Sequence, residues 1–181
     1  MCREIVSNAA PTLAGLKTGN LFTVDYTDRQ SSLREIRQIN GILSPAGLAA
    51  VPLRFSEKRI LLYVYRRSAL LSDLSDPERA RLLCSLGYKA TGIGSCISEL
   101  RRRLLSGGDF PHEIGLFLGY PTEDVIGFMT DRSSGCKLIG TWRVYGDEAS
   151  AREKFEQFNK CTRSYIEQFS KGVSLEKLVV A

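Results

Sequence analysis

The residues best suited to acid–base chemistry stand together in the segment Phe-Pro-His-Glu at positions 110–113. His112 is the single histidine of the chain, and imidazole is the side chain whose ordinary pKa lies closest to neutrality. Glu113 follows it at the start of the apolar run Ile-Gly-Leu-Phe-Leu-Gly. His112 could act as an acid, a base or a ligand at a loop–strand junction, or it could hydrogen-bond a backbone carbonyl and hold that junction in place.

The apolar run predicts a strand over residues 113–119, and neighbouring side chains on a strand point to opposite faces. His112 and Glu113 are therefore not expected to form a catalytic dyad with each other. A carboxylate among apolar neighbours needs a cationic or amide partner when it is buried, which Lys17 or an arginine such as Arg143 could supply. Such an ion pair would make Glu113 structural, whereas a shifted pKa would make it a catalytic candidate.

The thiols are a second source of chemistry. Their odd number and the absence of any Cys-x-x-Cys pair predict reduced cysteines rather than a disulfide framework. Cys136 follows Ser-Ser-Gly in a predicted loop and is the better candidate for a reactive thiol, while Cys161 lies on the apolar stripe of a predicted helix. Imidazole and thiolates from His112, Cys136 and Cys161 would suit zinc or iron. Their long, irregular separations nevertheless predict no metal site. The chain has five cysteines: Cys2, Cys84, Cys96, Cys136 and Cys161.

Several aromatic residues are candidates for ligand binding rather than for catalysis. Tyr120, Trp142 and Tyr145 could line a pocket for a planar ligand, because aromatic side chains with a polar group often border such sites, or they could be ordinary strand residues. The predicted ligand-binding set combines Tyr120 and Trp142 with Lys17, His112 and Glu113. Neither a dinucleotide fingerprint nor a phosphate loop occurs, so the sequence identifies no cofactor and leaves open whether the protein is an enzyme.

The elements that must position these residues follow one another in a mixed order. Apolar runs predict strands at 21–24, 51–55, 60–66, 113–119, 138–145 and 175–180. Helical periodicity and capping residues predict helices at 31–39, 76–87, 94–106, 121–128 and 147–172. We therefore expect an α+β or mixed α/β fold with a central mixed sheet of about five to six strands, covered by helices and ending in a long C-terminal helix.

Length and composition indicate the number of domains and exclude some classes of partner. A chain of 181 residues with 43% hydrophobic content is expected to form a single globular domain over residues 1–181. The net charge of +5 includes the run Arg-Arg-Arg at 101–103, which we assign to a solvated helix face because no aromatic residues interleave it, so nucleic acid is not expected as a partner. The absence of a long apolar run and of a secretory signal predicts no membrane association and a cytoplasmic location.

Three segments carry a resemblance to a known family. They are residues 10–22, the stretch from Phe110 through Phe128, and residues 136–161, which include Gly-Thr-Trp-Arg-Val-Tyr-Gly-Asp. Together they resemble an uncharacterised family of Firmicutes, domain-of-unknown-function family 3793, almost from end to end. The resemblance implies a bacterial protein, and it implies no reaction because the family carries no established activity.

Three hypotheses follow. The leading one is a protein that binds a small ligand or cofactor near His112, Glu113 and the turn at Tyr120 and Pro121. The second is a noncatalytic interaction or regulatory module that presents a protein-binding face of helix 147–172 or of the arginine-rich helix, for which an exposed aromatic stripe would be the sign. The third is a thiol- or metal-dependent redox enzyme, which requires Cys136 and Cys161 to approach each other or the histidine.

Overall fold

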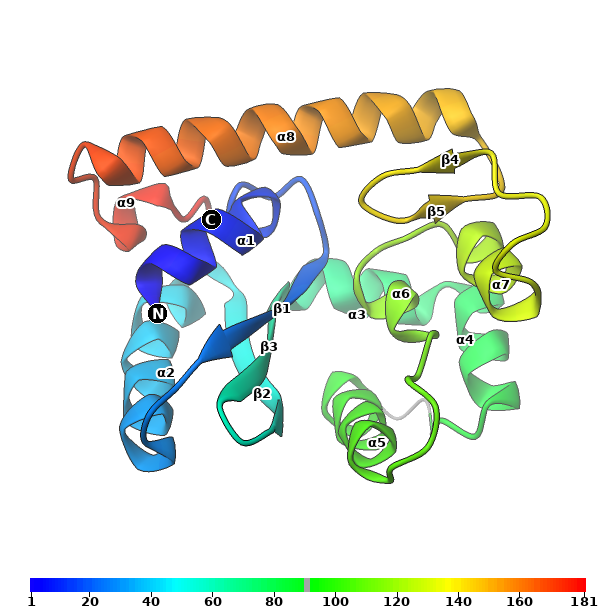
Figure 1. Ribbon diagram of the computed structural model, residues 1–181, viewed down its shortest axis with the longest axis horizontal. Helices are drawn as coiled ribbons and strands as arrows, with labels where there is room; N and C mark the ends of the chain where they lie inside the picture. Colours follow the sequence, from blue (N-terminus) through cyan, green and yellow to red (C-terminus); the bar gives the residue numbers. More distant parts are fainter. Residues whose placement is uncertain (90–91) are drawn as a thin grey trace. The chain divides into compact units, whose positions relative to one another are not determined.

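The computed structural model describes residues 1–89 and 92–181, and the chain divides into two compact units (Figure 1). The first unit comprises Met1–Ala69 and Lys160–Ala181, and the second comprises Leu70–Asn159. A single domain over residues 1–181 therefore stays a prediction, and each unit is described by itself.

The first unit is built on a three-stranded antiparallel sheet with strand order β1-β3-β2. The predicted hairpin of strands 51–55 and 60–66 is confirmed, and its second strand, β3, lies at the centre with residues 60–65 buried. The elements that lie wholly in this unit are α1 Cys2–Leu13, β1 Gly19–Asp25, α2 Arg29–Leu43, the 3-10 helix η1 Ser44–Ala46, β2 Leu48–Phe55, β3 Arg59–Arg66 and α9 Leu175–Leu178.

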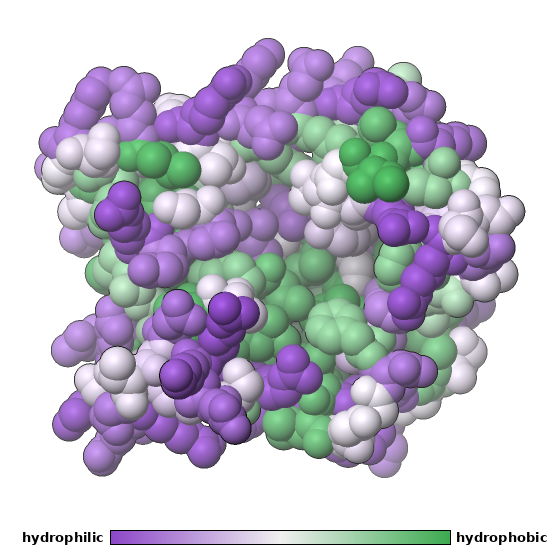
Figure 2. All heavy atoms as spheres, viewed as in Figure 1, coloured by the Kyte–Doolittle hydropathy of each residue, from purple (hydrophilic) through white to green (hydrophobic). Residues whose placement is uncertain are grey.

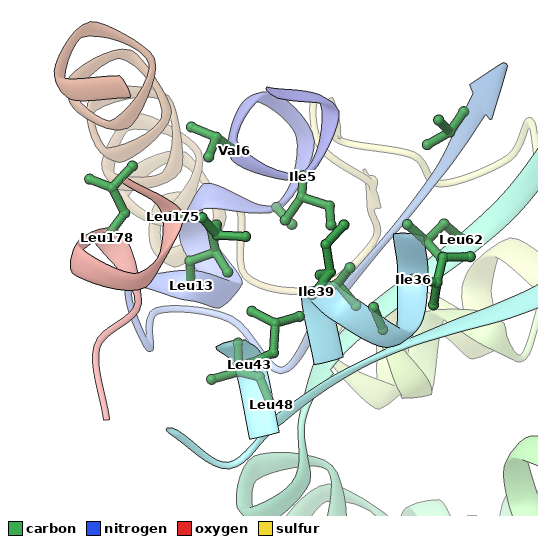
Figure 3. Close-up of a cluster of buried hydrophobic side chains, with 14 of the residues drawn as sticks. Ile5, Val6, Leu13, Ile36, Ile39, Leu43, Leu48, Leu62, Leu175 and Leu178 are labelled. Atoms are coloured by element: carbon green, nitrogen blue, oxygen red, sulfur yellow. The ribbon is translucent and has the colours of Figure 1, made fainter. Parts of the chain in front are cut away.

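One apolar core holds the first unit together, as Figure 3 shows. Because side chains alternate along a strand, Ile60, Leu62 and Val64 of β3 share one face of the sheet, and α1 and α2 pack on that face. The short helix α9 contacts both helices and closes the core with two leucines. The labelled members in Figure 3 are Ile5, Val6, Leu13, Ile36, Ile39, Leu43, Leu48, Leu62, Leu175 and Leu178.

Helix α2 is longer than the sequence indicates, and both of its ends differ from the prediction. Its N-cap is Asp28, whose carboxylate accepts from the Ser31 amide at 2.6 Å, rather than Ser32. The predicted helix end at Asn40 and Gly41 is wrong, because Asn40 lies within the helix and its side chain bonds the neighbouring strand. Its side-chain amide makes two 2.8 Å hydrogen bonds with the backbone of Ala50 in β2, which ties the helix to the sheet while the helix continues to Leu43.

The second unit is mainly helical. The predicted helix start at Asp76 is confirmed, since its carboxylate accepts from the amides of Glu78 and Arg79 and Pro77 occupies the first turn. The arginine run lies on α5, where Arg102 pairs with Glu99 at 2.7 Å. The elements of this unit are α4 Pro77–Ser85, α5 Ile93–Leu105, α6 Ile114–Phe117, α7 Thr122–Thr130, β4 Leu138–Ile139 and β5 Arg143–Val144; α3 Arg67–Ser75 and α8 Glu148–Ser170 each run from one unit into the other.

Three predicted strands are wrong, so the chain forms a three-stranded and a two-stranded sheet rather than a sheet of five to six strands. Residues 113–119 form a turn and the short helix α6, because a brief apolar run does not distinguish a buried strand from a buried helical turn. Residues 138–145 fold back as the β4–β5 hairpin around Gly140, whose amide bonds the Trp142 carbonyl at 3.0 Å. Residues 175–180 begin with the helix α9.

The long C-terminal helix is confirmed as α8, which runs along the top of the view in Figure 1. Its predicted stripe divides between two cores. Phe155 and Phe158 pack with the β4–β5 hairpin in the second unit, and Tyr165 and Phe169 pack on the core of the first unit. The outward side of the helix is mainly hydrophilic (Figure 2). Across the described ranges 1–89 and 92–181, no helix is both long and apolar enough to cross a lipid bilayer.

Candidate functional site

A cavity of about 260 Å³ opens in the second unit beside the candidate histidine. Three segments form it: the turn and short helix around α6, the inward side of α7, and the β4–β5 hairpin. Most of the lining is apolar, and the polar groups come from a few side chains. The lining residues are His112, Ile114, Gly115, Tyr120, Asp124, Val125, Phe128, Ile139, Gly140, Trp142 and Arg143.

Stacked aromatic rings form one wall of the cavity. The rings of Tyr120 and Trp142 lie 4.8 Å apart at an interplanar angle of 27°, and Phe155 of α8 meets the indole edge to face at 4.5 Å. The hydroxyl of Tyr120 donates to the Thr141 carbonyl at 3.3 Å. Burial raises the pKa of Tyr120 to about 12, so this phenol stays neutral and supplies a flat, rigid surface.

Asp124 fixes the indole and the hairpin in place. Its carboxylate accepts from the Trp142 indole N–H at 2.7 Å and from the amides of Tyr145 and Gly146 at 2.7 and 2.8 Å. Although Asp124 is 3% exposed, its buried charge is therefore satisfied by three donors. Asp124 thus acts as a clamp between α7 and the residues on either side of β5, and it also lines the cavity.

Basic groups surround the ring of Phe128 at the cavity. The His112 ring meets it edge to face with centroids 5.0 Å apart, and the guanidinium carbon atoms of Arg132 and Arg143 lie 5.3 and 5.9 Å from its centroid. The guanidinium of Arg132 contacts Nε2 of the imidazole. Burial, and then the Arg132 charge, lower the pKa of His112 below 6.5.

Glu113 has a different environment from that of His112. Its carboxylate, 4% exposed, accepts from the Tyr88 hydroxyl at 2.9 Å and from Arg103 Nη1 at 3.4 Å. Arg103 also bonds Glu99 at 2.9 Å. The expected ion pair is therefore present, and its cation is an arginine, Arg103, rather than Lys17 or the example Arg143. The carboxylate does not line the cavity.

The other sequence candidates do not gather at this cavity. Lys17 belongs to the first unit, where burial lowers its pKa to about 7. Cys161 also belongs to the first unit, and burial raises the pKa of its thiol. Cys136 belongs to the second unit, where its Sγ lies 3.5 Å from the Leu138 carbonyl oxygen. Within the part of the chain that the structure describes, no three histidine, cysteine or acidic side chains form a group able to hold a metal.

Sequence reasoning missed three parts of the site. Asp124 lies in the first turn of the predicted helix 121–128, and nothing in its local pattern indicates a clamp on residues about 20 positions away. Phe128 is the last residue of that predicted helix, and the sequence around Arg132 gives no sign of a role in binding. The helical spacing of Asp124, Val125 and Phe128, which places them on one side of α7, is the signal that could have found the wall.

Comparison with known proteins places most of the chain in one family model. Residues 5–179 match the family described as "Protein of unknown function (DUF3793)". No curated protein and no solved structure matches the chain.

Proposed function

The chain belongs to the family described as proteins of unknown function, DUF3793, and that description supplies no activity. From the geometry of the second unit, we propose that the protein binds a small ring-containing organic molecule in the cavity beside His112. The observation that carries this proposal is the stacked pair of Tyr120 and Trp142 facing an otherwise apolar space. A concave apolar site with a few placed polar groups is the usual form of a small-molecule site.

The volume of the cavity limits the ligand. Its 260 Å³ lies just below the roughly 300–1,000 Å³ of sites that take drug-sized molecules. A compound with one ring and a short side chain suits this space. The ring would lie against the apolar wall, where stacking adds to the gain from burying apolar surface.

The two other hypotheses have less support. Phe158 is buried, and Phe155 and Phe169 are half-buried within the two cores, so α8 presents no open aromatic stripe for a protein partner. Cys136 and Cys161 belong to different units, and both are free thiols. The cytoplasmic location and the bacterial origin stay predictions.

The single tryptophan gives a direct test, because Trp142 lines the cavity and no other indole exists in the chain. Phenylacetamide, a neutral ring compound, is added stepwise to the protein, and the fluorescence emission of Trp142 is recorded with excitation at about 295 nm. We expect a saturable change with a Kd of roughly 0.1–1 mM, as befits a ligand of this size. A linear response without saturation would count against the proposal.

A matched pair of phenylalanine variants locates the binding. Phe128 and Phe110 both contact the His112 ring, at 5.0 and 5.7 Å, but only Phe128 lines the cavity. We expect Phe128→Leu to raise the Kd for phenylacetamide by roughly fivefold through lost ring contact, and Phe110→Leu to change it by less than about twofold. Equal effects of the two substitutions would place the ligand elsewhere.

A further inference from the structure

The second feature of the cavity is a cluster of basic side chains at its rim, in which the two arginines carry positive charge and His112 is neutral at pH 7. Two guanidinium groups and one imidazole, from Arg132, Arg143 and His112, surround the ring of Phe128 within 6 Å of its centroid. Two of the three, His112 and Arg143, line the cavity itself. A purely apolar ligand would give this cluster nothing to bind.

Among the described residues, neither Arg132 nor Arg143 forms an ion pair with a carboxylate. Two acids accept hydrogen bonds from other groups: Asp131, next to Arg132 in the chain, accepts from Ser133 and Ser134, and Asp124 accepts from the hairpin. The two guanidinium groups therefore place positive charge without a carboxylate partner beside a mainly apolar space.

The guanidinium group of Arg143 also uses only some of its N–H donors in hydrogen bonds to the described residues. Its Nη1 donates to the Arg132 carbonyl, and this is its one hydrogen bond to the described residues. The contact holds the guanidinium near the Phe128 ring while its remaining N–H groups stay available. A guanidinium held in this way presents parallel donors that match the two oxygens of a carboxylate.

We infer that the ligand of this cavity is a ring compound that carries a carboxylate, which Arg143 binds at the rim while the ring lies against Tyr120 and Trp142. This inference rests on the proposed function and names the chemical class of its ligand. Arg132 contributes charge and holds Arg143 through its carbonyl. Asp124, whose negative charge also borders the cavity, directs the carboxylate away from itself and toward the arginines.

The test compares two ligands of the same shape and different charge. Phenylacetate and phenylacetamide are titrated against Trp142 emission at pH 7.5 in low salt, where the acid is ionised. We expect phenylacetate to bind about tenfold more tightly, because a charge-assisted bidentate contact is stronger than a neutral one. We also expect 0.5 M NaCl to reduce that ratio several-fold, because the arginines are partly exposed to screening ions.

Arginine variants assign the effect to a residue. In Arg143→Gln we expect the ratio of the two Kd values to fall to within about threefold, because only the acid loses a charge-assisted contact. Arg132→Gln, at an exposed position, should reduce the ratio by a smaller factor. This second variant tests the effect of the positive charge even if Arg143→Gln does not fold. Arg101→Gln removes one charge from the exposed face of α5 and leaves the ratio unchanged.

The outcomes separate this inference from the proposed function. Equal affinities of acid and amide would overturn the inference and leave the neutral binding site standing. A tenfold ratio that persists in Arg143→Gln would overturn the role of Arg143. If neither compound gives a saturable change, the inference and the proposed function both fail.

Discussion

His112 lies where two effects favour its neutral form. Partial burial disfavours the imidazolium, and the positive charge of Arg132, which contacts the ring, disfavours it further. Both effects lower the pKa of His112 below 6.5, whereas the weaker influence of Glu113 and Asp109 raises it. At pH 7 the residue is therefore a hydrogen-bond acceptor that helps to hold Arg132 near the cavity.

The lowered pKa predicts a specific dependence of stability on pH. Between the pKa of the folded protein and the unfolded value near 6.5, the unfolded chain binds more protons, so the free energy of unfolding falls as pH falls. The contribution of His112 is fully present above pH 6.5 and is lost below it. We expect His112→Gln, which keeps an acceptor at every pH, to lack this loss when urea unfolding is compared at pH 7.5 and 5. The same change in the free energy of unfolding between pH 7.5 and 5 in the wild-type protein and in His112→Gln would contradict this role of His112.

Which residues could be recognised from sequence depends on how local their role is. The importance of His112 and Trp142 follows from residue type alone, since each is the single member of its kind. The partner of Glu113 was missed because Tyr88 and Arg103 come from a separate loop and helix, and only the folded chain places them beside the carboxylate. Positions that act through distant partners leave no pattern in the neighbouring sequence.

At the scale of elements, the cavity depends on the connection between α7 and the hairpin. The strands β4 and β5 are only two residues long, so their own ladder holds few hydrogen bonds. The three bonds to Asp124 supply what the short ladder lacks. The clamp therefore positions the stacked rings as well as the backbone.

Removal of the clamp predicts a loss of both stability and site geometry. We expect Asp124→Ala to lower the free energy of unfolding by roughly 2–4 kcal/mol, because buried N–H donors lose a charged acceptor. Trp142 emission should shift to longer wavelength in the folded variant as its indole is released. Glu153→Ala, at an exposed position of α8, serves as the control and should change stability by less than about 0.5 kcal/mol. Equal effects of the two substitutions would show that the clamp is unimportant.

Elements with local signals could be predicted, and those without could not. Asp76 followed by Pro77 marks a helix start because both residues act within one turn. The apolar run at 114–118 carries no such signal, although it forms the short helix α6 and is followed by Gly119 with a φ of +76°. The fold class follows from the order of helices and strands, whereas the number of strands depended on three short runs of this ambiguous kind.

At the scale of the whole molecule, helix α8 supplies apolar side chains to both cores. Phe158 belongs to the core beside the cavity, and Tyr165 and Phe169 belong to the core of the first unit. A helix forms cooperatively, because its hydrogen bonds link successive turns. Unfolding of one core therefore removes support from the helix that the other core also needs.

This shared helix predicts a single cooperative transition, in agreement with the expectation of one domain. Leu43→Ala, at a fully buried position of the first unit, should lower stability by roughly 2–5 kcal/mol. We expect the urea midpoints from Trp142 emission and from far-ultraviolet circular dichroism to move together. Leu105→Ala, at a position that is 57% exposed, should leave both midpoints nearly unchanged. A Trp142 midpoint that stays in place in Leu43→Ala would instead establish two independent domains.

The most direct test of the binding site is a titration of ¹⁵N-labelled protein with phenylacetate, followed by two-dimensional NMR. Trp142 gives a single indole N–H resonance, since it is the only tryptophan. We predict saturable shifts of this resonance and of the backbone amides of His112, Phe128 and Arg143, with the amides of Ile5 and Leu62 in the first unit unchanged. An indole resonance that does not move, or shifts concentrated in the first unit, would contradict the proposed site.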